Sequence, residues 1–125
     1  MTTAAKTRIK EMLIAFEAKD ADAFLNHFAE DAILFDPHYP EPEMQGKAAI
    51  RNGLSFAFNM ISRPGFHLEN FWTDGRTGAV EVQTHHIFQD GNEARFPQVF
   101  VFEMQNNLLT RLQSYVPYPP PPAAA

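Results

Sequence analysis

Three stretches of the chain repeat their apolar residues with the period of an amphipathic helix. Between residues 4 and 18 the apolar positions follow the spacing i, i+3, i+4 and i+7, at Ile9, Met12, Leu13 and Phe16. A shorter stretch begins at a capping aspartate, Asp20 or Asp22, groups three apolar residues (Phe24, Leu25 and Phe28) on one face, and ends near Asp31. The third stretch runs from Gly46 or Lys47 to about Ile61. The pattern predicts three helices, all in the first half of the chain.

Strand-like segments follow a different pattern. The run from Ala32 to Asp36 is apolar and short, and Pro37 ends it because proline cannot donate a ladder hydrogen bond. After Gly65, four segments separated by turn sequences alternate apolar and polar positions; they span 66–73, 79–89, 95–104 and 108–116. This order of elements predicts an α+β fold in which a curved antiparallel sheet wraps around the three helices.

Composition narrows the class of protein. The chain has 125 residues, of which 45% are hydrophobic and twelve are phenylalanine, and this favours one globular domain over residues 1–116. The net charge of −5, without any cluster of lysine or arginine, argues against nucleic-acid and membrane partners. There is no cysteine, which excludes thiolate zinc sites and cysteine nucleophiles. Neither a signal peptide nor a membrane-spanning run is evident, so we expect a cytoplasmic protein.

The proline-rich end, residues 117–125, cannot join a sheet. We expect a disordered or polyproline-like tail. Two interpretations of this tail are open: a simple solvated end, or a ligand for a proline-recognising domain.

Strand parity predicts which polar side chains share the apolar faces. His86 has the parity of Val82 and Thr84, and Gln98 lies in a row of aromatic residues that includes Phe100. In the first strand Asp36 has the parity of Ala32 and Leu34; in the last, Tyr115 has that of Leu109, Arg111 and Gln113. A carboxylate, an imidazole, an amide and a phenol would then meet in one apolar pocket, the usual composition of a small-molecule site.

Each of these polar residues also has a structural interpretation. Asp36 precedes a proline and would then be a turn residue that hydrogen-bonds its own loop. His86 would be a satisfied core histidine, and Gln98 would bridge strands or meet a partner subunit. His85 points to the opposite face from His86 and is expected to be exposed or at an interface.

A metal site is a further alternative, but the sequence does not favour it. Adjacent histidines on a strand point to opposite faces, so His85 and His86 cannot share an ion. Asp36, His38, Glu41 and Glu43 could be drawn as a cluster, yet their spacing matches no common metal motif. We expect no metal and no cofactor.

The segment "FAEDAILFDPHYPEPEMQGKAAIRNGLSFAF" resembles the ketosteroid isomerase and SnoaL-like branch of the NTF2-like superfamily. In that branch an acidic residue followed by proline ends the first strand, and a "G-x-A-A-I-R" helix follows. The order of helices and closing strands agrees with the family over nearly all of the chain. The resemblance implies a cone-shaped α+β fold with an internal pocket, commonly a homodimer joined through the outer face of the sheet.

Carried over residue by residue, the resemblance implies that Asp36 occupies the position of the family's general-base aspartate and Tyr115 that of an aromatic wall residue. Ketosteroid isomerase stabilises its enolate with two donors, a tyrosine and a neutral carboxylic acid. The positions of these two donors fall here on Met12 and Gln98.

The residues and the resemblance together suggest a small cofactor-independent enzyme. Asp36 would be the base and His86 a second catalytic residue, with Gln98, Tyr115, Met12 and Phe100 binding a small hydrophobic substrate. An isomerase, a polyketide cyclase, and a dehydratase or hydrolase all fit this description. The alternative is a non-catalytic module of the same fold that binds a ligand or dimerises through its sheet.

Overall fold

The computed structural model describes residues 2–117. The predicted elements occur in the predicted order, and two short strands, Glu43–Gln45 and Ile61–Arg63, occur in addition. The helices are α1 (Thr2–Glu17), α2 (Ala21–Leu25) and α3 (Lys47–Met60). The strands are β1 (Phe28–Phe35), β2 (Glu43–Gln45), β3 (Ile61–Arg63), β4 (Phe66–Thr73), β5 (Thr77–Phe88), β6 (Glu93–Gln105) and β7 (Leu108–Tyr115). All but one residue of the expected proline-rich tail lie outside the described residues, so the prediction for that tail is not tested.

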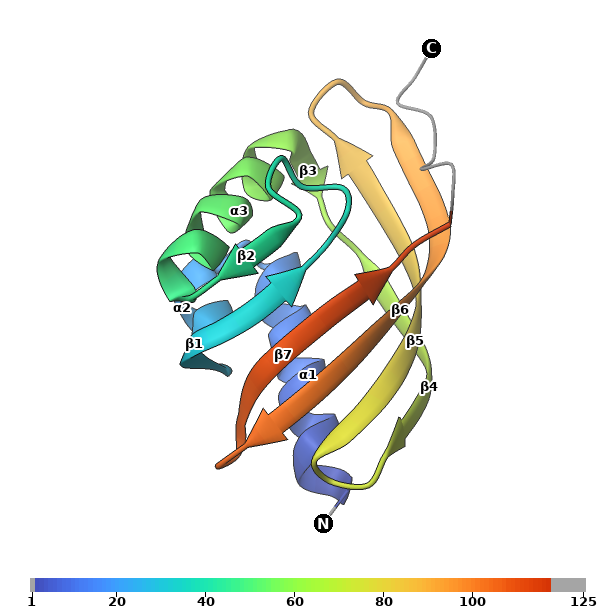
Figure 1. The fold of residues 1–125 in the computed structure, drawn as a ribbon. Helices are drawn as coiled ribbons and strands as arrows, with labels where there is room; N and C mark the ends of the chain where they lie inside the picture. Colours follow the sequence, from blue (N-terminus) through green and yellow to red (C-terminus); the bar gives the residue numbers. More distant parts are fainter. Residues whose placement is uncertain (1, 118–125) are drawn as a thin grey trace.

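One seven-stranded sheet contains all the strands named above, in the order β2-β1-β7-β6-β5-β3, with β4 paired to β5 beside β3. The four strands from β4 to β7 pair antiparallel with one another in sequence order, as predicted. β1 pairs with β7 in parallel, so the sheet is mixed. Figure 1 shows the sheet curving around α1, with α2 and α3 beside β1 and β2. The predicted α+β fold class is confirmed.

The boundary between α2 and β1 differs from the prediction. Asp20 caps α2 by accepting a hydrogen bond from the Ala23 N–H at 3.0 Å, but the helix ends at Leu25. Phe28, expected on the helix, begins β1 instead and pairs with Leu109 of β7. Its side chain is fully buried, as either assignment would require, so the burial pattern alone could not separate a longer helix from a longer strand.

The core lies between the concave face of the sheet and the helices. Its largest fully buried side chains come from α1, α3 and the inner positions of the strands: Phe28, Phe102, Ile9, Met12, Ile50 and Leu54. The Glu17 carboxylate accepts a hydrogen bond from the Phe66 N–H at 2.8 Å and so ties the end of α1 to the start of β4. This contact holds α1 across the concave face, where the strand pattern places the predicted site.

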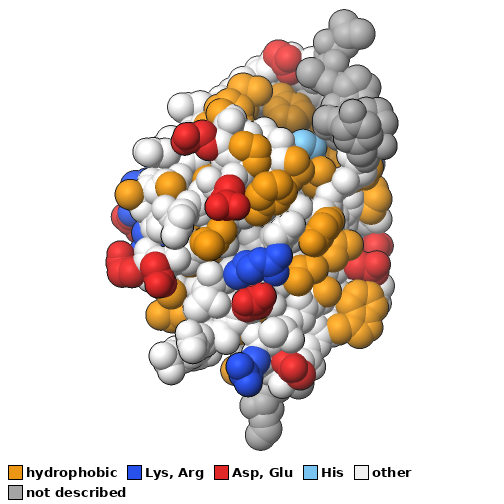
Figure 2. All heavy atoms as spheres, viewed as in Figure 1, with side chains coloured by type: hydrophobic (Ala, Val, Ile, Leu, Met, Phe, Trp, Pro, Cys, Tyr) orange, Lys and Arg blue, Asp and Glu red, His pale blue; other side chains and the backbone are white. Residues whose placement is uncertain are grey.

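The outer face of the sheet carries both charged and apolar side chains. Trp72 and Tyr115 are the most exposed aromatic residues among those described, at 55% and 51%. Figure 2 looks onto β7 and β6 with α1 behind them, and groups of hydrophobic side chains lie there between charged ones. No helix among the described residues is long and apolar enough to cross a membrane.

Candidate active site

A cavity of about 720 Å³ lies between the concave face of the sheet and the helices. Its wall is mostly apolar and strongly aromatic, with contributions from α1, α2, β4, β5 and β6: Phe16, Phe24, Phe66, Phe88, Phe96 and Phe100. A volume of this size suits a drug-sized organic molecule. Asp36, His86 and Gln98 all line the cavity, as strand parity predicted.

Asp36 follows the last residue of β1 and is buried, with 8% of its surface exposed. Its backbone N–H donates to the Pro42 carbonyl oxygen at 2.9 Å, which closes the loop between β1 and β2. Asp36 Oδ1 accepts a hydrogen bond from the His38 N–H at 2.9 Å, the turn-type contact expected of an aspartate before proline. The Asp36 carboxylate thus makes the turn contact of the structural interpretation and also lines the cavity.

Burial raises the pKa of the Asp36 carboxyl above its ordinary value. The His38 N–H, the nearby His38 ring and a hydrogen bond with the Ser114 hydroxyl act in the opposite direction but do not cancel the effect of burial. Burial, and then the nearby Asp36 charge, also raises the pKa of the Tyr39 phenol. Asp36 is therefore a stronger base than a solvated aspartate, and Tyr39 stays protonated beside it.

Gln98 lies in the middle of the sheet floor, between two buried hydroxyls. Its Oε1 accepts a hydrogen bond from the Thr84 hydroxyl of β5 at 2.7 Å, and its Nε2 donates to the Ser114 hydroxyl of β7. Thr84, Gln98 and Ser114 are 1%, 5% and 3% exposed. The predicted strand-bridging role of Gln98 is confirmed, and it leaves one amide hydrogen available to the cavity.

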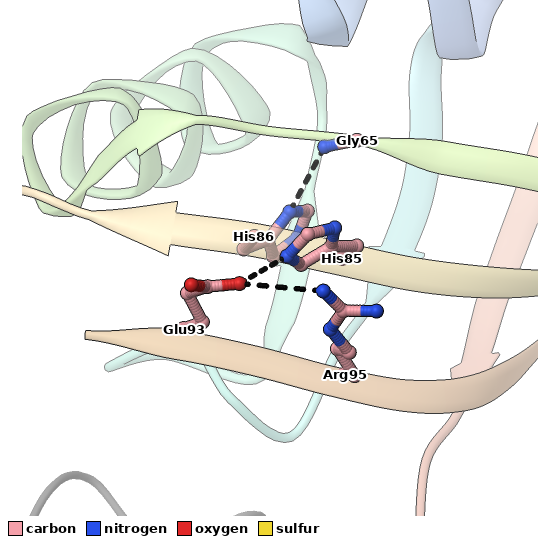
Figure 3. Close-up of polar contacts among 5 residues, drawn as sticks. All are labelled: Gly65, His85, His86, Glu93 and Arg95. Atoms are coloured by element: carbon pink, nitrogen blue, oxygen red, sulfur yellow. Dashed lines mark hydrogen bonds and ion pairs between the residues drawn. The ribbon is translucent and has the colours of Figure 1, made fainter. Parts of the chain in front are cut away.

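His86 is enclosed by aromatic rings. Those of Phe66 and Phe16 lie with centroids 5.4 and 6.1 Å from it, and Phe88 and Phe96 stand edge-on at 6.5 and 6.4 Å. The Gly65 N–H donates to His86 Nδ1 at 3.3 Å (Figure 3), so in the neutral ring the proton is on Nε2. Burial, with smaller effects of His38 and His85, lowers the pKa of His86 to about 4. His86 is therefore neutral near pH 7.

His85 points to the other face of β5. Its Nε2 lies 2.6 Å from Glu93 Oε1, and Arg95 Nη2 lies 3.6 Å from the same oxygen (Figure 3). All three side chains are at least 40% exposed. The sequence-based expectation for His85, an exposed position opposite to His86, is confirmed.

Of the remaining predicted site residues, the structure places two in the cavity and one outside it. Met12 and Phe100 line the cavity. Tyr115 does not belong to the lining; it is half exposed and pairs with Val99 on the outer face. The prediction was wrong because β7 carries a register shift: Leu109 pairs with Met104 but Arg111 pairs with Glu103. The extra residue, Thr110, reverses the parity of everything after it.

Among the cavity residues that the sequence analysis did not identify are two that lie close to Asp36, Ser114 and His38. Ser114 takes the inward position expected for Tyr115, and no sequence signal reveals the shift that puts it there. His38 lines the cavity beside Asp36, packs edge-on against Phe96 at 5.6 Å, and has a buried Nε2 without a hydrogen-bond partner among the described residues. The adjacent "DPH" was the available signal. Among residues 2–117 no group of histidine and acidic side chains is placed to hold a metal ion.

The sequence model of the SnoaL-like domain matches residues 9–112, which covers most of the chain. The protein therefore belongs to the SnoaL-like domain family, within the NTF2-like superfamily. No curated protein matches the sequence significantly.

Solved structures confirm the fold. An NTF2-like protein of unknown function from Burkholderia pseudomallei is 16% identical, with a TM-score of 0.82 and 91% of each chain covered. A Mycobacterium tuberculosis protein in complex with estradiol-17beta-hemisuccinate is 17% identical, with a TM-score of 0.80 and 92% of this chain and 95% of that chain covered. An LEH-like epoxide hydrolase from the same organism is also 17% identical, with a TM-score of 0.79 over 93% of this chain and 84% of that one. At these identities the likeness extends to the fold alone.

Proposed function

We propose that the protein is an enzyme acting on a small hydrophobic molecule, with Asp36 as its general base. The observation that carries this proposal is a buried carboxylate in an aromatic cavity, with its pKa raised by burial and no lysine or arginine among the described residues that line the cavity. A structural carboxylate is normally paired with a cation when it is buried. Perturbed carboxylates in a cleft are typical of catalytic acids and bases.

The reaction that fits best is removal of a proton from carbon next to a carbonyl. An ordinary aspartate, with a pKa of about 3.9, is a weak base for such a proton, so both a raised pKa and a stabilised product anion are required. Neutral His86 presents Nε2–H, and Gln98 has one amide hydrogen that its partners do not use. These two donors would stabilise the oxygen on which charge develops. The chemistry requires no cofactor.

Isomerisation, cyclisation and dehydration or hydrolysis all begin from a base placed in this way. The fold neighbours include a protein solved with a steroid derivative and an epoxide hydrolase, and this range of chemistry supports an apolar substrate for the same architecture. We favour a neutral substrate, because the lining contains the acids Asp36, Asp90 and Glu93 and its described residues include no compensating lysine or arginine.

A ligand-binding module without catalysis is the second candidate, and two observations favour it. Met12 occupies the position of a donor in ketosteroid isomerase, and a thioether cannot donate a hydrogen bond. Gln98 uses both ends of its amide within the sheet. Under this alternative, Asp36 would orient a bound molecule and turnover would be absent.

Deuterium exchange tests the base directly. The protein is incubated in D₂O with neutral apolar ketones such as tetralones, cyclohexenones and 3-ketosteroids, and loss of the α-proton signal is followed by ¹H NMR. We expect the wild type to accelerate exchange of at least one ketone, and Asp36→Asn to slow it about 100-fold or more. The melting temperature of the variant should stay within a few degrees of the wild type.

Asp31→Asn is the matched control, since Asp31 lies exposed on β1, the strand that ends just before Asp36. It should exchange at the wild-type rate. Equal rates in Asp36→Asn and wild type would remove Asp36 from the mechanism. Binding of the ketones without any enzyme-dependent exchange would favour the binding module.

We further propose that two copies associate through the outer face of the sheet. Trp72 and Tyr115 are exposed there, and Val99 and Val101 lie between them on β6. Homodimerisation and the cytoplasmic location both stay predictions.

A further inference from the structure

Four buried side chains form a continuous row across the floor of the cavity. The row begins at Thr84 on β5, continues through Gln98 on β6 and Ser114 on β7, and ends at Asp36 after β1. Each member is at most 8% exposed. Hydrogen bonds join Thr84 to Gln98 and Gln98 to Ser114. Ser114 lies beside Asp36, because the residues that precede them, Gln113 and Phe35, are paired in the parallel ladder of β7 and β1. Valine or leucine would fill the positions of Thr84, Gln98 and Ser114 in an apolar core, so packing alone does not require these polar side chains.

The direction of each hydrogen bond in this row follows from the chemistry of the groups. A carboxylate has no hydrogen, so Ser114 must donate to Asp36. The single Ser114 hydrogen is then used, and its oxygen accepts from Gln98 Nε2. That places Gln98 Oε1 toward Thr84, which must donate to it. One orientation of the Gln98 amide therefore satisfies all four groups.

The opposite orientation of the Gln98 amide would break the row between Ser114 and Asp36. Gln98 Oε1 would face Ser114 and take its hydrogen, and the Asp36 carboxylate would lose that donor. Thr84 favours the productive orientation, because its hydroxyl donates to the amide oxygen at 2.7 Å. Thr84 thus acts on Asp36 through two intermediate side chains.

We propose that Thr84, Gln98 and Ser114 are positioning residues that direct the Ser114 hydroxyl at the Asp36 carboxylate and fix the orientation of the base. The inference rests on the proposed function of Asp36 but concerns its geometry and ionisation, which can be measured without turnover. These three residues, which we call the relay, help to keep the carboxylate charged in an apolar cavity, since hydrogen bonds to the charged form favour that form.

The effect of the Ser114 hydroxyl on the Asp36 pKa must be distinguished from that of other titratable groups nearby. His38 and Tyr39 follow Asp36 in the same loop. Of these two, His38 lowers the pKa of Asp36 through its charge. His86, Asp90 and Glu93 line the same cavity from β5, β6 and their connecting turn. All five remain in place in the variants below, so a change in the Asp36 titration reports on the relay.

The test is a titration of Asp36 by ¹³C NMR in protein labelled at the aspartate carboxyl carbons, with the signal assigned from the spectrum of Asp36→Asn. Ser114→Ala removes the donor and should raise the pKa of Asp36 by about one unit, because a hydrogen bond to a charged group contributes about that much. Ser114→Thr keeps a hydroxyl and should restore the wild-type value. Thr84→Val should raise the pKa by a smaller amount, and Thr84→Ser should not.

Thr110→Val is the matched control, because it removes a hydroxyl of β7 that bonds to the Glu103 carbonyl oxygen, away from the row. It should leave the Asp36 titration unchanged. In the exchange assay, Ser114→Ala should move the acidic limb of the pH profile to higher pH and lower kcat more than it raises KM.

An unchanged Asp36 titration in Ser114→Ala would overturn the relay even if Asp36 proves to be the base. If Ser114→Ala does not fold, Thr84→Val provides the same decision. A raised pKa without any exchange activity in the wild type would support the relay and count against the proposed catalysis. The two failures are therefore distinguishable.

Discussion

The two faces of the sheet place the same types of polar residue in different surroundings. His86 on the concave face is surrounded by aromatic rings and neutral near pH 7, whereas its neighbour His85 on the convex face lies in an exposed cluster with Glu93 and Arg95. The concave face holds few polar groups, and those of the cavity floor are hydrogen-bonded in a defined direction. The convex face holds ion pairs that water can replace. The few polar groups of the concave face are therefore held in a fixed geometry, whereas those of the convex face are not.

The largest expected difference between the faces is in packing. Phe102 on the concave face of β6 is fully buried and packs on Phe71 with ring centroids 5.7 Å apart. Phe102→Ala should lower the free energy of unfolding by about 3–5 kcal/mol, since it leaves a large cavity. The neighbouring Val101 points outward and is half-buried, and Val101→Ala should cost about 1 kcal/mol or less. Urea unfolding measures both, and equal losses would contradict the assigned faces.

The pH dependence of stability should also separate the faces. The unfolded chain protonates His86 near pH 6.5, whereas the folded protein keeps it neutral until about pH 4. Between these values the unfolded state binds the additional proton, so the free energy of unfolding falls as the pH falls, by on the order of 3 kcal/mol from this residue. His86→Asn keeps an acceptor for the Gly65 N–H and should remove that slope. Unfolding by urea from pH 7 to pH 4 measures it.

Two comparisons separate the contribution of His86 from those of Asp36 and His85. Asp36 contributes with the opposite sign in the acid range, because its raised pKa means that the folded state takes up its proton first as the pH falls. The difference between wild type and His86→Asn removes that contribution, which both share. His85→Asn should change the slope much less, because its ion pair is exposed. A slope that survives in His86→Asn would show that the buried ring is not its source.

The smallest expected effect concerns the convex face. Glu93 lies within reach of His85 and Arg95, and its side chain is 50% exposed. Glu93→Gln should change the free energy of unfolding only slightly at pH 7, with any loss diminishing at high salt. Thermal unfolding at low salt and at about 1 M salt measures this. A larger, salt-independent loss would indicate that the cluster is not a solvated ion pair.

The period of the strands made much of the concave face predictable. On β5 and β6 the inward positions of Val82, Thr84, His86, Gln98 and Phe100 were identified because side chains alternate strictly along an unbroken strand. The position of Asp36 followed from the same rule on β1. The helical stripe of α1 likewise placed Met12 in the core.

The rule failed on β7, where one additional residue at Thr110 turned Ser114 inward and Tyr115 outward. A register shift is set by how two strands twist and pack against one another, and it leaves no period in the sequence of either strand. The parallel pairing of β1 with β7 has the same origin, since it joins segments about eighty residues apart. The sequence shows that residue 38 is a histidine, but the conformation of its loop determines whether the side chain lines the cavity.

The α+β class, the apolar lining and a carboxylate at the end of the first strand could be predicted, because local periodicity and residue chemistry are sufficient for these. Which hydroxyl lies beside that carboxylate depends on contacts between distant parts of the chain. The row from Thr84 to Asp36 requires four strands in one register, and a hydrogen bond depends on distances of about 3 Å between residues that are far apart in the chain.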